Sequence, residues 1–138
     1  MALKVPNQGE LELLDLMLKE ATTADEKYLL KLYQNDKTPA DADATSSYTV
    51  ADFTNYATRT LSRSGWATAV TTSNKAESSY LAVQSWTCGA SGNTIYGYYV
   101  EGSASNKCLW AERFATQRVL ATGDVLNITP KFTLSTES

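Results

Sequence analysis

TIYGYYVEGSASNKCLWAERF, the stretch from Thr94 to Phe114, gives the clearest indication of how this chain folds. Aromatic and β-branched residues, which favour strands, lie on both sides of GSASN, Gly102 to Asn106, whose small and polar residues favour a turn. We therefore predict a hairpin in which Thr94 to Glu101 pairs with Lys107 to Phe114.

Segments of similar composition recur on both sides of this hairpin, separated by turn residues at intervals of about ten residues. Such spacing is typical of a sandwich or barrel, and no alternation of strands with helices indicates a parallel sheet. We expect an all-β fold, an antiparallel β-sandwich, over residues 25–138. The further segments are YLLKLY from Tyr28, NYATRTLSR from Asn55, WATAVTT from Trp66, SYLAVQSWTC from Ser79 and VLNITPKFTL from Val125.

An N-terminal arm, residues 1–24, differs from the rest because GELELLDLMLKEA, Gly9 to Ala21, is rich in helix formers. Its leucines recur at helical spacing, which predicts a short amphipathic α-helix. Two alternatives remain open for its apolar face, which either lies in a groove of a partner protein or packs on the chain's own sandwich. The residues of this face are Leu11, Leu14, Met17 and Leu18.

Charge and composition narrow the classes of function. The formal net charge of −3 argues against a nucleic acid partner, because phosphates are normally bound by clustered Lys and Arg. The chain contains no histidine, which is the usual general base near neutral pH and the commonest metal ligand. We expect no enzymatic activity, no catalytic residues, no cofactor and no metal. No apolar run long enough for a signal peptide or membrane span is visible, so we expect synthesis in the cytoplasm and no membrane contact.

The two cysteines, Cys88 and Cys108, are too few for a disulfide-framed scaffold and are not spaced as a metal knuckle. We predict that both are buried free thiols. A disulfide between them stays possible, and it would need a crossover in the sheet.

The aromatic residues near the hairpin have two interpretations. Trp86, Tyr96, Tyr98 and Trp110 fall on alternating strand positions, where large rings fill a sandwich core. Exposed on one surface, these rings together with Trp66 and Tyr99 would instead form a platform for sugars. Consecutive residues of a strand point to opposite faces, so either Tyr98 or Tyr99 should meet solvent or a partner. We predict Tyr99 as that contact, since tyrosine is enriched at interfaces.

Acidic residues offer weak candidates for chemistry. Asp36, Asp41 and Asp43 lie in the loop NDKTPADADATSS, but their spacing lacks the glycine and closing glutamate of a calcium loop. We interpret them as solvated carboxylates. Glu112 and Arg113 are neighbours in a strand and should point to opposite faces, so they do not form a site together.

Several segments together resemble a family of small virion proteins encoded by tailed phages, and the likeness covers nearly the whole chain. No catalytic residues are carried over from that family. The most specific segments are LYQNDKTP at Leu32 to Pro39, NTIYGYYV at Asn93 to Val100, LWAERF at Leu109 to Phe114 and ITPKFTL at Ile128 to Leu134.

The resemblance implies a structural role in the phage particle, with a jelly-roll-like sandwich. A cement or decoration protein on the capsid exterior, made in the host cytoplasm, is the function it favours. Such a protein binds the major capsid protein and its own copies, as a dimer or trimer, and strengthens the shell through buried interface area. The alternative is a tail-fibre or baseplate module that binds a host glycan or another tail protein.

Overall fold

The computed structural model of the chain describes residues 3–6, 8–9, 27–62, 65–67, 70–72 and 75–134. Over these residues the protein is all-β and antiparallel, and the predicted β-sandwich is confirmed. The 3-10 turn η1 (Thr45–Ser47) lies between two of the strands, and Gln8 and Gly9 have a helical backbone. The strands are β1 (Leu3–Lys4), β2 (Tyr28–Tyr33), β3 (Arg59–Leu61), β4 (Val70–Thr72), β5 (Lys75–Ser79), β6 (Gln84–Thr87), β7 (Thr94–Gly102), β8 (Cys108–Val119), β9 (Val125–Ile128) and β10 (Lys131–Leu134).

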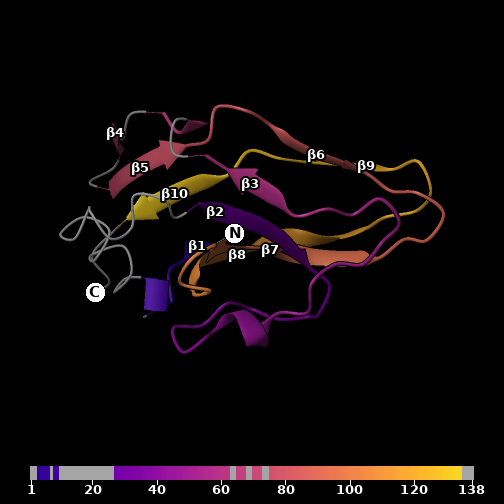
Figure 1. Cartoon of the computed structure of the whole chain (residues 1–138), viewed down its shortest axis with the longest axis horizontal. Coiled ribbons are helices and arrows are strands. Elements are labelled where there is room, and N and C mark those ends of the chain that lie inside the picture. The colour runs from indigo at the N-terminus through magenta and orange to yellow at the C-terminus, as the bar shows by residue number, and fades with distance from the viewer. Residues whose placement is uncertain are drawn as a thin grey trace.

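One five-stranded sheet, in the order β1-β8-β7-β2-β3, forms the centre of the molecule. Two smaller sheets, β10-β5-β4 and β6-β9, form the second layer. In Figure 1 these smaller sheets lie on one side of β2, β7 and β8, while the loop that carries η1 lies on the other side. The central sheet is therefore covered on both of its faces.

The predicted hairpin is present as β7 and β8. Tyr98 pairs with Glu112 and Val100 with Trp110, and the Gly102 N–H donates to the Lys107 carbonyl (3.0 Å) at the turn. The prediction ended the second strand at Phe114, whereas β8 continues to Val119.

The extension of β8 contains a wide bulge. Gly97 pairs with Arg113 and Ile95 with Arg118, so residues 114–117 of β8 lie opposite Tyr96 alone on β7. Extra residues in one strand bend it and interrupt the ladder. The bulge also explains why Tyr96 and Tyr98 pack on different faces of the sheet, although they are two residues apart.

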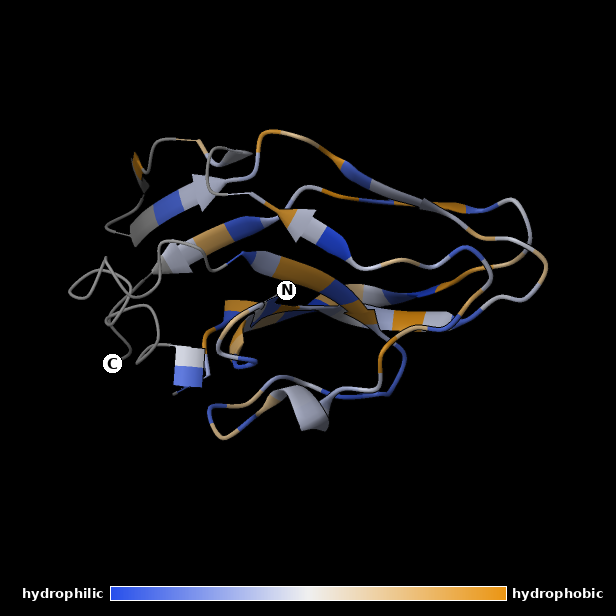
Figure 2. Ribbon diagram, viewed as in Figure 1, coloured by the Kyte–Doolittle hydropathy of each residue, from blue (hydrophilic) through white to orange (hydrophobic). Residues whose placement is uncertain are grey.

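The inner face of the central sheet packs against the second layer and forms the larger core, here called the inner core. Trp86 of β6 is 1% exposed and Trp110 of β8 is 2% exposed, and Tyr98 is buried with them, as predicted. Trp110 stacks at a tilt on Phe132 of β10, with 4.8 Å between ring centroids. The hydropathy colouring of Figure 2 shows β2 as largely hydrophobic, in keeping with its position between two covers.

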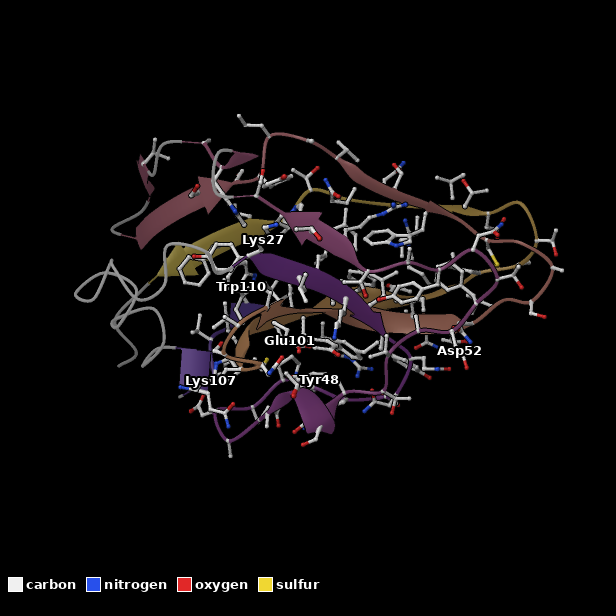
Figure 3. All side chains as sticks on the ribbon, in the orientation of Figure 1. Lys27, Tyr48, Asp52, Glu101, Lys107 and Trp110 are labelled. Carbon is white, nitrogen blue, oxygen red and sulfur yellow. The ribbon has the colours of Figure 1, made fainter. Side chains whose placement is uncertain are left out.

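The outer face is covered by the loop between β2 and β3, which brings Tyr48 over the sheet. Tyr48 stacks on Tyr99 (4.8 Å, 17° between planes) and contacts Tyr33 (5.0 Å). Figure 3 shows Tyr48 on the η1 side of the sheet and Trp110 on the side of β10. We call this packing the outer cluster; its buried members are Tyr33, Tyr48, Tyr99, Cys108 and Ala111.

Ion pairs stabilise the position of the loop between β2 and β3 over the sheet. Each of the three loop aspartates that we interpreted as solvated meets a cation, and in the described residues no group of acidic or cysteine side chains converges as a metal site requires. The pairs are Lys4–Asp41 (3.5 Å), Lys37–Asp43 (2.8 Å) and Arg113–Asp36 (2.7 Å).

The prediction of solvated carboxylates is wrong most clearly for Asp43, because its side chain is buried. Its carboxylate accepts hydrogen bonds from the Tyr48 hydroxyl (2.8 Å) and the Ala40 N–H (2.9 Å), as well as pairing with Lys37. Burial alone would raise the pKa of Asp43, but the bonds from Lys37, Ala40 and Tyr48 lower it below its usual value. The charge of Asp43 therefore holds Tyr48 over the sheet.

Only part of the predicted N-terminal arm lies within the described residues. β1 pairs with β8, so Leu3 and Lys4 belong to the sandwich and not to a separate arm as we predicted. Gly9 is buried, with no room for a β-carbon between it and the Leu109 carbonyl. Apart from Gly9, the predicted helix lies outside the described residues. In the residues that the structure describes, no helix has the length and apolar character needed to cross a membrane.

Candidate functional site

Tyr99, the predicted partner contact in the sandwich, is only 1% exposed. It does point away from Tyr98, as strand geometry requires, but the stacked ring of Tyr48 covers it. The prediction was wrong because a loop distant in sequence closes over this face. The other predicted contacts, Leu11, Leu14, Met17 and Leu18, lie outside the described residues.

The sugar-platform interpretation is also wrong for four of its six rings, while Trp66 and Tyr96 are half-buried. Trp86, Trp110, Tyr98 and Tyr99 are all buried, so their faces are not available to a sugar. Tyr96 is half-buried, and the Arg113 guanidinium lies over its ring (5.2 Å from the centroid).

A groove of about 750 Å³ with a mixed polar and apolar lining opens between the two layers. Its volume falls in the range of binding sites for small molecules or peptide segments. We call it the open groove. Its lining residues are Ser79, Tyr98, Glu112, Phe114, Ala115, Thr116, Arg118, Leu126, Asn127, Ile128, Thr129 and Lys131.

Two strand edges make this groove. β1 pairs only with Ala111 and Glu112, so the bulged residues that follow have no neighbour on that side within the described residues. β9 pairs with β6 alone, which leaves its other edge free in the same part of the structure. Residues of both strands line the groove, so the sandwich is open where these two edges meet.

Glu112 and Tyr98 form the inner wall. The Tyr98 hydroxyl donates to the Glu112 carboxylate over 2.7 Å. Burial raises the pKa of Tyr98, and the adjacent Glu112 charge raises it further, so the phenol stays neutral and keeps donating. Glu112 points into the groove while Arg113 reaches Asp36 on the outer face, which confirms that these neighbours point to opposite faces.

The cations of the groove differ in how they are paired. Lys131 lies 3.3 Å from the Glu77 carboxylate. Arg118 is exposed, and no carboxylate of the described residues pairs with its guanidinium. Among the described residues, the groove thus presents the Arg118 charge at its rim without a carboxylate partner.

The remaining lining is suited to binding. The half-buried Phe114 supplies apolar surface, and Asn127, whose side chain accepts a hydrogen bond from the Ser85 hydroxyl (2.5 Å), supplies an amide. Glu112 is the single carboxylate among the described lining residues, so a pair of acids of the kind used in glycoside hydrolysis is not present in that lining.

Exposed aliphatic residues lie beside the groove. Val119 at the end of β8 is 70% exposed and Val125 at the start of β9 is 54% exposed. Both line a shallower hollow that adjoins Arg118. Apolar side chains next to free strand edges are typical of protein contacts.

Sequence reasoning missed this site. Glu112 was considered only as a lone acid, and Arg118, Asn127 and Lys131 were not considered as binding residues. The available signal was that β-forming residues continue beyond Phe114 as ATQRV, with a cation at Arg118. The bulge that opens the groove depends on how β7 and β8 pair, which local composition does not specify.

Both cysteines are buried free thiols, as predicted. Cys88 belongs to the inner core and Cys108 to the outer cluster, so the central sheet separates them. Burial raises the pKa of the Cys108 thiol to about 12, which keeps it protonated and unreactive.

Comparison with known proteins assigns no family to the chain. No family model matches it, and a search of curated proteins finds no match either.

Proposed function

We propose that this protein is a structural component of a tailed-phage particle, a capsid decoration protein that binds the major capsid protein and its own copies. The role in the particle rests on the resemblance described above. The observation that supports the binding role is the open side of the sandwich, where β8 and β9 have edges without a neighbour among the described residues and adjoin the exposed Val119 and Val125. Free edges and exposed aliphatic residues are surfaces that other proteins cover.

The construction of the sandwich supports such a role. The central sheet is buried on both faces, by the second layer and by the loop carrying Tyr48, so it forms a rigid support. A decoration protein works through binding free energy multiplied over many copies, and a rigid support reduces the entropy lost in each contact.

The predicted helix supplies a second contact in this proposal. Leu11, Leu14, Met17 and Leu18 insert into a groove of the neighbouring capsid protein. Replacing all four with serine should lower occupancy on particles while the melting temperature of the isolated protein stays unchanged. The matched control replaces the exposed Thr60 and Thr87 with serine and should leave occupancy unchanged. A lower melting temperature for the fourfold variant would mean that the helix packs on its own sandwich.

The experiment that tests the function locates the protein on purified particles of a phage that encodes it. Antibody labelling should mark the head, and particles lacking the protein should lose DNA at lower temperature than complete particles. Labelling confined to a fibre or baseplate would favour the alternative, a tail module binding a glycan or a tail protein. Absence from purified particles would refute both.

A further inference from the structure

We propose that the open groove binds an extended, acidic segment of a partner protein, which adds as a strand to the free edge of β9 and pairs a carboxylate with Arg118. This names the contact through which the proposed function operates. It is tested on the isolated protein, so its failure and the failure of the role in the particle can be told apart.

One edge of β9 has no pairing partner among the described residues. β9 (Val125–Ile128) is paired with β6 on one side, and its other side faces the groove, where residues 126–129 form part of the lining. A free edge presents unpaired N–H and C=O groups at the spacing that an added strand matches. A strand laid there would enlarge the β6-β9 sheet and close the open side of the sandwich.

The chain itself uses the same kind of contact nearby. β1 is only two residues long, yet it adds to the edge of β8 opposite Ala111 and Glu112, and Leu3 packs against the inner core. In this antiparallel register the groove lies beyond Leu3, the first residue of β1 that the structure describes. A partner strand would thus cover the part of this side that β1 leaves open, and its inward side chains would meet the half-buried Phe114.

The charges of the groove indicate that the bound segment is acidic. Glu112 is already bound by Tyr98 and Lys131 by Glu77, whereas Arg118 has no carboxylate within the described residues. Arginine pairs with carboxylates in a bidentate manner, which favours an acidic residue in the bound strand.

Two other occupants fit less well. An acidic sugar would use the Arg118 charge but would leave the β9 edge unpaired, and the groove offers the half-buried Phe114 as its ring. A symmetric contact between two copies would bring the Arg118 side chains of both to the same opening, with like charges facing each other.

The test uses two synthetic peptides, acetyl-Thr-Val-Glu-Val-Thr-Val-amide and the same peptide with lysine in place of glutamate. Amide NMR spectra of the full chain are recorded during titration with each. The acidic peptide should shift the amides of residues 126–129, because main-chain hydrogen bonds supply the affinity of strand addition. The lysine peptide should leave them unshifted.

Two variants, each replacing one cation with glutamate, test whether Arg118 supplies the charge that binds the peptide. Arg118→Glu should weaken binding of the acidic peptide at least about tenfold, the loss expected for a charge-assisted hydrogen bond. Lys27→Glu should bind as the unchanged protein does, since Lys27 is exposed and lies beside the turn between β7 and β8. Unshifted amides elsewhere in each variant would show that the fold is retained.

Four results would overturn the proposal. They are unshifted β9 amides with saturating acidic peptide, equal shifts with the lysine peptide, tighter binding of a uronic acid disaccharide at the same amides, and a dimer in the isolated protein with β9 amides protected by the second copy.

Discussion

The two halves of β8 have opposite surroundings. Cys108 to Ala111 are buried, with β1 and β7 beside this half and covers on both faces of the sheet. From Ala115 to Val119 every residue is exposed, β1 has ended and the bulge interrupts pairing with β7. A single strand therefore supplies both the centre of the fold and an edge available to a partner.

This difference shows how a small sandwich combines rigidity with binding. The first half is fixed by the inner core on one side and by Tyr99 beneath Tyr48 on the other. Because that half is held so firmly, the second half keeps its position without being covered. Binding there should cost little ordering entropy, which improves affinity for a given contact area.

The largest expected effect on stability comes from truncating one aliphatic residue to alanine in each half of β8. Leu109 is fully buried, so Leu109→Ala should lower the free energy of unfolding by about 2–5 kcal/mol. Val119→Ala removes an exposed side chain and should change it by less than about 0.5 kcal/mol. Chemical denaturation of both variants measures the difference, and similar values would contradict the comparison.

A smaller effect on stability is expected in the loop that covers the first half of β8. Asp43→Asn should lower the free energy of unfolding by about 1–3 kcal/mol near neutral pH, because Lys37 and Tyr48 lose a buried charged acceptor. The control is Asp36→Asn, whose carboxylate is 71% exposed and whose loss should cost at most about 1 kcal/mol.

The Asp43 contribution also predicts a dependence on pH. Its pKa is lower in the folded protein than in the unfolded chain, so the stability it provides is present above its ordinary value of about 3.9. That stability is lost as the pH falls through the lower folded value. The difference between the protein and Asp43→Asn should therefore narrow on acidification below about pH 4. A constant difference down to the acid transition would show that the charge of Asp43 is not what holds the loop.

The smallest effect is expected in the exposed half. Gln117→Ala and Arg118→Ser replace residues at the bulged end of β8 and should each change the free energy of unfolding by less than about 0.5 kcal/mol. Thermal unfolding measures this. Losses above 1 kcal/mol would mean that the second half supports the fold.

Strands and turns with local signals could be predicted from the sequence. The hairpin of β7 and β8, strand β2 and the burial of Trp86 and Trp110 follow from alternation and composition. β5, whose sequence is KAESS, was not predicted, because a polar strand is held by backbone pairing and carries no apolar pattern.

Contacts between distant segments could not be predicted in the same way. The burial of Tyr99 depends on Tyr48, and the covering loop has the composition of a solvated linker. The open groove depends on where β1 ends and on the extra residues in β8, and both are properties of strand pairing. Local composition therefore could not predict the open groove.

Amide hydrogen exchange along β8 and β9 in the isolated protein tests the central claim most directly. The account predicts slow exchange at Ala111 and Glu112, which pair with both β1 and β7, and fast exchange at residues 114–117, together with the β9 amides that face the groove. Uniformly slow exchange over both halves of β8 would contradict it, because the edge on which the proposed binding depends would already be covered.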